Sequence, residues 1–359
     1  MKGCRVLRHT GDFMFNTILA KIVSVFLTVL MILFAPLNLI IGKKTARISD
    51  AEKDCRLSFA AISDIHLDEK ASFISDGMFE LGLMDMEKAK DRLDAVVFDG
   101  DQTNHGYIGQ WDIFASSLEK HDVSDNLFIV TGNHDTWGPN RDDFTNPVDG
   151  VLPTFIKYNK SIAGREINNM YYSDIVNGYY FIVLGSEQDS TSAYISDAQL
   201  KWFASEMKKA AKTKLPIFVF CHQPINETHG LPYNWDLDEN DSADTGGLGD
   251  QSDAVAAILK KYDNVFYITG HIHAGFKNEN SKIGVDYATV EYMKNDNGNN
   301  VTLVNLPCFA NPDVLRGAYI SNGCGFVVEA YDSHVLLRAR NFGAHTWITK
   351  FDVRVDIVK

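Results

Sequence analysis

The chain has 359 residues, of which 45% are hydrophobic, and its formal net charge at pH 7 is −13. This composition excludes an intrinsically disordered chain, and the negative charge argues against a protein that binds a nucleic-acid duplex through a basic face. The five cysteines are widely spaced, so they indicate neither a zinc knuckle nor a disulfide framework.

The N-terminal part of the sequence predicts a membrane segment. After a short basic segment at 1–21, residues 22–41 form a run of 20 residues without a charged side chain. A helix of this length spans about 30 Å, the thickness of a bilayer core. We predict a transmembrane or signal-anchor helix at 22–42 and a linker at 43–55, and we expect residues 56–359 to form one domain. The run is longer than the apolar part of a cleaved signal peptide, which favours an uncleaved anchor. The distribution of basic residues around the run favours a domain outside the cytoplasm. We therefore expect a membrane-anchored or secreted protein.

Beyond the linker, short apolar runs alternate with helical patterns, which is typical of an α/β domain. Strands buried on both faces are predicted at 57–64, 93–101, 126–135, 179–187, 215–224 and 264–273. Helices are predicted at 75–92, 107–120, 197–212 and 252–262. After residue 280, strands without intervening helices predict a second, more antiparallel sheet, and a hairpin turns at Asp332 and Ser333; these strands are 301–309, 325–332 and 334–342.

Five of the predicted strands end in side chains that are able to bind metal ions. In chain order these side chains are Asp64 and His66, Asp101, Asn133 with His134, His222, and His271 with His273. The carboxyl ends of strands in an α/β sheet are where sites form, so we expect these groups to lie close together. Because residues i and i+2 of an extended chain point the same way, each D-x-H or H-x-H pair is expected to face one point. One such strand end is weak evidence, but five in order are hard to explain by packing.

The order D-x-H, G-D, G-N-H-D, H and G-H-x-H resembles the motif series of the calcineurin-like metallophosphoesterase superfamily, which includes purple acid phosphatases and class III cyclic nucleotide phosphodiesterases. The motifs cover residues 57–275. The resemblance implies a four-layer α/β/β/α sandwich of two mixed sheets flanked by helices, with residues 301–342 completing the second sheet. It also implies two metal ions, one held by Asp64, His66, Asp101 and His273 and the other by Asp101, Asn133, His222 and His271.

The same resemblance implies hydrolysis of a phosphoester by in-line attack of a metal-bridging hydroxide on phosphorus. Mixed oxygen and nitrogen ligands suit Mn, Fe, Zn or Co. We interpret His134 either as the proton donor to the leaving-group oxygen or as a donor to a phosphoryl oxygen, with Asp135 orienting its imidazole and raising its pKa. Asn104 and His105, which follow the bridging Asp101, either line the substrate pocket or cap the next helix.

The substrate class stays open between alternatives. The five motifs contain no Lys or Arg, and Arg141 lies a few residues beyond one of them. The lack of a phosphate clamp favours a phosphodiester, such as a cyclic nucleotide or a lipid head group, over a doubly charged monoester. A phosphomonoesterase or nucleotidase is the first alternative, and a catalytically silent binding module of the same fold is the second. The complete ligand set argues against the silent module.

Overall fold

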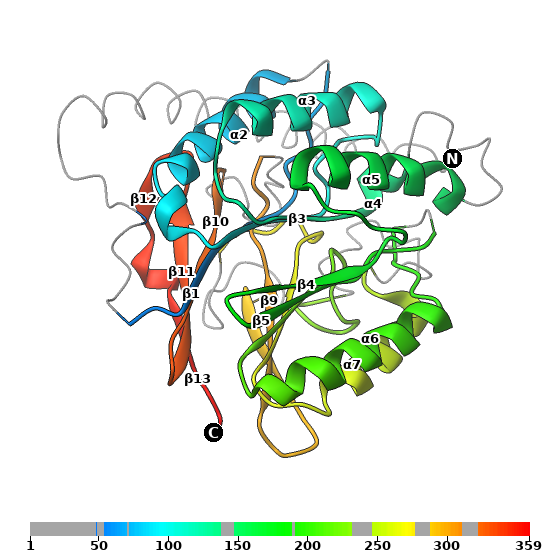
Figure 1. Ribbon diagram of the computed structural model, residues 1–359, viewed down its shortest axis with the longest axis vertical. Helices are drawn as coiled ribbons and strands as arrows, with labels where there is room; N and C mark the ends of the chain where they lie inside the picture. Colours follow the sequence, from blue (N-terminus) through cyan, green and yellow to red (C-terminus); the bar gives the residue numbers. More distant parts are fainter. Residues whose placement is uncertain are drawn as a thin grey trace, which may run out of the picture.

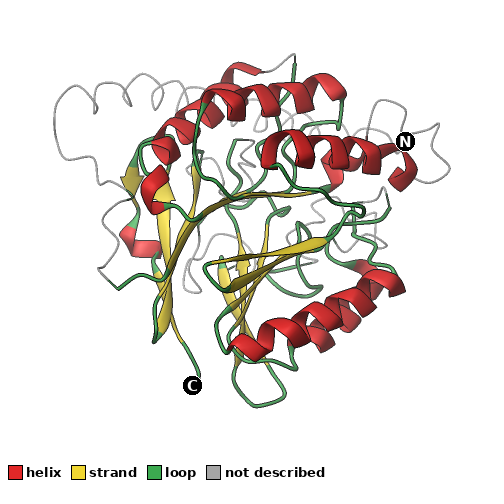
Figure 2. Cartoon of the chain, in the orientation of Figure 1, coloured by secondary structure: helices red, strands yellow, loops and turns green. Residues whose placement is uncertain are grey.

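The protein is built from two mixed β-sheets that pack face to face, with helices on their outer faces (Figures 1 and 2). The prediction of a mixed α/β fold with two mixed sheets flanked by helices is confirmed. The computed structural model describes residues 48, 54–69, 72–137, 147–188, 191–231, 246–276, 288–310 and 322–359.

The first sheet has seven strands and contains the first three strands of the chain. Its order is β12 (Thr346–Trp347), β11 (His334–Asn341), β10 (Cys324–Ala330), β1 (Leu57–Ile62), β2 (Ala95–Asp99) and β3 (Leu127–Val130), and β13 (Val353–Asp356) also pairs with β11. β1 is parallel to β2 and antiparallel to β10.

The second sheet has six strands. Its order is β4 (Tyr172–Val176), β5 (Tyr179–Val183), β6 (Ile217–Phe220), β7 (Val265–Thr269), β9 (Asn300–Asn305) and β8 (Val290–Lys294). The four central strands β5, β6, β7 and β9 run parallel to one another. The edge strands β4 and β8 are antiparallel to their neighbours β5 and β9.

The helices cover the sandwich from both sides. α2, α3 and α5 lie above the first sheet in Figure 1, and α6 and α7 lie below the second. The predicted helices at 75–92, 107–120, 197–212 and 252–262 correspond to α2 (Ser72–Glu87), α3 (Ile108–Lys120), α6 (Asp197–Ala210) and α7 (Ser252–Leu259). Two α-helices among the described residues were not predicted, namely α4 (Asn133–Trp137) and α5 (Pro147–Ala163).

The prediction that the strands after residue 280 form the second sheet together is wrong. β9 adds to β7 in the second sheet, whereas β10 and β11 extend the first sheet beside β1. All six residues of β1 are buried, so the backbone of this strand needs a hydrogen-bonded partner strand along each edge. The apolar sequence of a buried strand does not determine which other strand becomes its partner. The hairpin is confirmed, since Ala330 pairs with Val335 across the turn at Asp332 and Ser333.

The predicted membrane helix at 22–42 lies outside the described residues, as does most of the linker at 43–55. Among the helices of the described part of the chain, none combines the length and the apolar character that crossing a bilayer requires.

Aromatic rings join the two sheets in the core. Phe59 of β1 makes edge-to-face contacts with Phe181 of β5 and Phe218 of β6, at centroid distances of 5.0 and 4.9 Å. All three side chains are fully buried. Their packing fixes the spacing of the sheets beneath the strand ends that carry the predicted site.

A buried ionic cluster attaches α2 to β11. Arg340 donates from Nε and Nη2 to the two carboxylate oxygens of Asp85, at 2.6 and 2.8 Å, and His345 Nδ1 lies 2.8 Å from Asp85 Oδ1. The pKa of Asp85 lies below its usual value. Burial by itself would raise this pKa, but the hydrogen bonds from His345 and Arg340 outweigh the effect of burial.

We expect Asp85→Asn to lower the free energy of unfolding by about 3–5 kcal/mol, because it leaves the buried Arg340 without its counter-charge. Since the pKa of Asp85 is lowered, its stabilising effect should be present above about pH 4 and be lost as the pH falls through the lowered value. Urea denaturation measures both effects. Asp332→Asn is the matched control, because Asp332 pairs with Arg56 in solvent and its loss should leave stability unchanged. Equal stability of the two variants would contradict the prediction.

Candidate metal centre

The predicted metal ligands come from five loops that follow strands of both sheets. Three loops leave β1, β2 and β3 of the first sheet, and two leave β6 and β7 of the second. They carry, in this order, Asp64 and His66, Asp101, Asn133, His222, and His271 with His273. The candidate site therefore lies across the carboxyl ends of both sheets, as expected for this class of architecture.

Five of the seven predicted ligands lie on left-handed and not on extended backbone. Asp64, His66 and Asp101 have φ of 58°, 51° and 53°, and His271 and His273 have φ of 74° and 54°. The expected cause, an extended chain, is therefore wrong, although Asp64 and His66 do converge on one group while His271 and His273 lie in two. Left-handed residues cost about 1 kcal/mol each and persist where the surrounding structure imposes them, often at functional sites.

Two glycines of the motifs make room for the ligands. A Cβ atom on Gly100 would lie 2.2 Å from His222 Nδ1, and one on Gly132 would lie 2.0 Å from Asp101 Oδ1. Both distances are shorter than any real carbon contact, so a larger residue would displace a ligand. The glycines of the G-D and G-N-H-D motifs are thus explained by close packing against His222 and Asp101.

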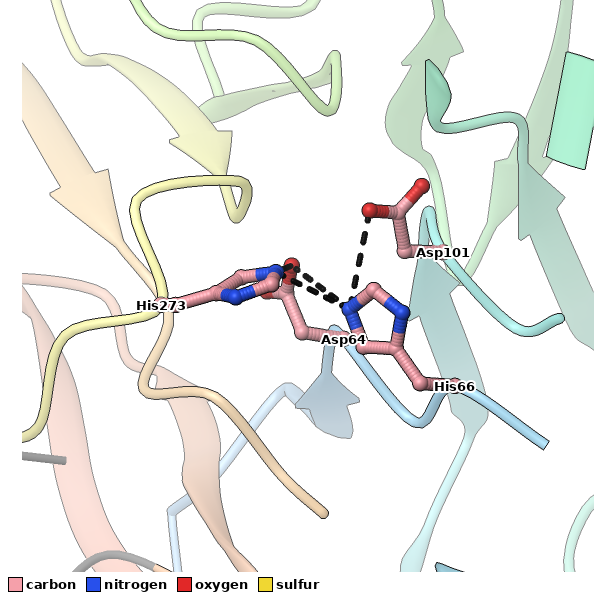
Figure 3. A group of neighbouring side chains, drawn as sticks. All are labelled: Asp64, His66, Asp101 and His273. Carbon is pink, nitrogen blue, oxygen red and sulfur yellow. Dashed lines mark hydrogen bonds and ion pairs between the residues drawn. The ribbon is translucent and has the colours of Figure 1, made fainter. Parts of the chain in front are cut away.

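The first group of ligands consists of Asp64, His66, Asp101 and His273, whose side chains point toward one another in Figure 3. One ligand atom from each lies within 4.8 Å of the others. The Nε2 atoms of His66 and His273 are 2.9 Å apart, and His273 Nε2 lies 3.3 Å from Asp64 Oδ1. His66 Nε2 lies 3.7 Å from Asp101 Oδ2. Such a spacing of donor atoms suits a shared cation.

The second group consists of Asp101, His222 and His271, again with ligand atoms within 4.8 Å of one another. His222 Nε2 lies 3.1 Å from Asp101 Oδ2. Asn133, the fourth predicted ligand, is 2% exposed, and its Oδ1 has no hydrogen-bond partner in the described part of the chain. Asp101 belongs to both groups, which is the placement required of a carboxylate that bridges two metal ions.

The charges of the groups also fit cations. Burial lowers the pKa of His66 and of His271, so both imidazoles are neutral at pH 7 and offer a lone pair. Burial opposes ionisation of Asp64, but hydrogen bonds from His273 and His66 hold the pKa of this carboxyl well below its usual value. The carboxylates of Asp64 and Asp101 are buried, and the described residues of the motif loops include no Lys or Arg that could balance their charge. Bound cations would supply that balance.

His222 differs from the other histidines because its pKa is raised to about 10. Burial by itself would lower this pKa, but the negative charge of Asp101 and the hydrogen bond with its carboxylate raise it by more. The Nδ1 atom of His222 lies 2.8 Å from the carbonyl oxygen of Asp99, which turns Nε2 toward Asp101. A metal ion bound by Nε2 must therefore replace a proton.

The hydrogen bonds of Asp135 and of the His134 imidazole go to other partners in the described part of the chain, so the predicted orienting role is wrong. Its carboxylate accepts hydrogen bonds from the backbone N–H groups of Gly132 and Thr103, at 3.0 and 2.9 Å, and from Thr103 Oγ1 at 2.7 Å. The carbonyl oxygen of Asn104 instead accepts from His134 Nδ1 at 2.7 Å. Burial lowers the pKa of His134 to about 4, which also contradicts the expected increase. Asp135 thus holds two ligand loops together.

The alternative that Asn104 or His105 caps the next helix is wrong. α3 begins at Ile108 after Tyr107, and no side chain caps it. Asn104 Nδ2 donates to Asp68 Oδ2 at 2.7 Å, and the His105 side chain is 43% exposed beside them. Contact of Asn104 and His105 with substrate stays a prediction. Asp68 was not singled out from the sequence, although it is a second carboxylate two residues after His66.

The fold and the motif loops together define a class of metal-dependent hydrolase. The family model of the calcineurin-like phosphoesterases matches residues 57–275, and the chain belongs to this family. The protein is therefore a phosphoester hydrolase with residues grouped for metal binding. The comparison with curated protein sequences finds no match.

Two solved structures show the same fold. A dimetal phosphatase from Danio rerio aligns with a TM-score of 0.55 and 14% identity, over 85% of this chain and 100% of that one. A purple acid phosphatase from yellow lupin (Lupinus luteus) seeds aligns with a TM-score of 0.54 and 14% identity, over 84% of this chain and 53% of that one. At this identity the similarity is one of fold alone.

We expect the affinity for Mn²⁺ to rise with pH, because a metal ion must displace the proton of His222. Release of one proton corresponds to a gain of about tenfold in affinity per pH unit below the raised pKa. Isothermal titration calorimetry at pH 6, 7 and 8 measures it. His121→Ala, which removes a partly buried histidine between Glu80 and Glu87 away from the site, controls for adventitious binding. An affinity that does not change with pH would contradict the prediction.

Proposed function

We propose that the protein is a dinuclear metal-dependent phosphodiesterase. The observation that carries this proposal is the convergence of two ligand groups on one shared carboxylate, Asp101. Manganese, iron, zinc and cobalt are the candidate ions, since the donors are oxygen and nitrogen. One ion would be held by Asp64, His66, Asp101 and His273, and the other by Asp101, Asn133, His222 and His271.

Metal ions bound at these positions supply a water of lowered pKa as the nucleophile and Lewis acidity toward the phosphoryl oxygens. The chain's own residues supply the proton for the leaving group. The ring of His134 lies 4.6 Å from that of His66, and its Nδ1 is tied to the Asn104 carbonyl, so Nε2 is left for the substrate. A bound phosphoester would place negative charge beside this imidazole, which favours protonation of Nε2.

The polarity of the surrounding loops supports a diester substrate. The described residues of the loops after β1, β2 and β3 contain no Lys or Arg, and Asp68 and Glu69 add negative charge there. A phosphodiester carries one negative charge, whereas a monoester carries nearly two at pH 7, so the diester meets less repulsion. We propose Asn104 and His105 as substrate contacts at this rim.

Release of p-nitrophenol from bis-p-nitrophenyl phosphate and from p-nitrophenyl phosphate, each with Mn²⁺, Fe²⁺, Zn²⁺ or Co²⁺, tests the proposal. We expect the diester to be the better substrate and Asp101→Asn to abolish turnover, since it removes the shared carboxylate. Asp332→Asn is the surface control and should keep full activity. Absence of turnover with every metal would refute the metal-dependent mechanism, and preference for the monoester would refute the diester assignment.

We expect His134→Ala to lower kcat by about 10²–10⁴-fold on a diester with an alkyl leaving group, because an alkoxide needs a proton to depart. On a p-nitrophenyl diester the loss should be less than about tenfold, because p-nitrophenolate leaves without one. ³¹P NMR of the phosphate product measures the rate on the alkyl diester, and the absorbance of released p-nitrophenolate measures the rate on the p-nitrophenyl diester. His121→Ala, a change of a partly buried histidine away from the metal centre, is the control. Equal losses on both substrates would contradict the acid role.

A further inference from the structure

Four aromatic rings form a continuous row that begins at the metal centre. The ring of His134 lies 3.9 Å from that of Trp137, Trp137 lies 6.4 Å from His105, and His105 lies 5.4 Å from Tyr107. The interplanar angles are 37°, 25° and 37°, so Trp137 and His105 are stacked and the other two pairs are tilted. We call these four residues the aromatic row. Two of them come from α4 and two from the loop between β2 and α3.

The row leads from the buried site to the surface. Its inner member, His134, packs against His66, and its outer member, Tyr107, is 39% exposed. The His105 side chain is 43% exposed, and the neighbouring Ile108 is 44% exposed. The two outer rings, those of His105 and Tyr107, therefore offer exposed aromatic surface against which a planar ligand group can pack.

Hydrogen bonds hold the outer part of the row in place. The backbone N–H of His105 donates to Gln110 Oε1 at 2.8 Å, and that of Gly106 donates to Thr103 Oγ1 at 3.1 Å. Thr103 is in turn bound to Asp135, which joins this loop to the loop of His134. The rings are therefore presented on a backbone that is fixed to the metal-binding loops, so their position relative to the candidate metal ligands is defined.

The charge beside the row selects against a second phosphate. Asp68 accepts from Asn104 next to His105, and Glu69 packs against Gly109 at the start of α3. A ligand group lying here meets flat π-faces and negative side chains, so an uncharged planar ring fits better than an anionic group. Base–aromatic stacking accepts any nucleobase because every base has a π-face.

We propose that the aromatic row binds a nucleobase of the phosphodiester substrate, and that His105 and Tyr107 determine this specificity. The inference rests on the proposed phosphodiesterase function and narrows its substrate class to nucleotide diesters. The row acts by binding alone, and the bond broken at phosphorus is the one that the metal centre hydrolyses.

The test compares two diesters that differ only in the base, adenosine 5′-(methyl phosphate) and methyl riboside 5-(methyl phosphate), with Mn²⁺ present. In the wild type, kcat/KM should be about tenfold higher for the adenosine diester. Tyr107→Ala and His105→Ala should each reduce this ratio, and the double variant should bring it near one. Tyr292→Ala, which removes a tyrosine that is 45% exposed on the edge strand β8, is the matched control and should keep the ratio.

Hydrolysis of bis-p-nitrophenyl phosphate in parallel separates the two hypotheses. If that ester is cleaved but the two ribose diesters react equally in the wild type, the role of the row is refuted and the proposed function stands. If none of the three esters is cleaved with any metal, the proposed function itself is refuted. Equal losses on both ribose diesters in Tyr107→Ala would show a structural role for the tyrosine and would also refute the inference.

Discussion

The candidate site depends on one buried carboxylate, that of Asp101. Its Oδ2 lies 3.1 Å from His222 Nε2 and 3.7 Å from His66 Nε2, and its Oδ1 accepts from the backbone N–H of His134 at 2.9 Å. Both ligand groups contain it, so the loops of both sheets converge on its charge. A fully buried anion of this kind requires cations or donors around it, and that requirement organises the surrounding loops.

The fold meets this requirement with strained loops and small residues. The left-handed residues after β1, β2 and β7 turn their side chains inward where the strands end, and Gly132 allows Asp101 to approach α4. The strain is sustained by hydrogen bonds such as those of Asp64 with the backbone of His271, and by Asp135, which ties the loop of Thr103 to that of His134. The proposed chemistry and the proposed base specificity both use this rigid frame.

Much of the fold and of the ligand set was predictable because local signals were strong. Continuous apolar runs located β1, β2, β3, β6 and β7, and the polar residues at their ends identified the groups that the structure brings together. The edge strands β4, β8 and β13 are only partly buried, so their apolar pattern is weak. α5 was missed although it packs over β3, and it contains Pro153, a residue that normally argues against a helix.

The sequence by itself determined the family, the order of the motifs and the chemical types of the candidate ligands, because these are properties of short segments. Only the tertiary structure decided that β10 and β11 join β1, that Asp135 supports a loop while Asn104 orients His134, and that four rings align beside the metal centre. The reason is physical. Strand partners, hydrogen-bond acceptors and ring contacts come from residues that are distant in the sequence. The type of a residue does not determine which of these distant residues lies next to it after folding.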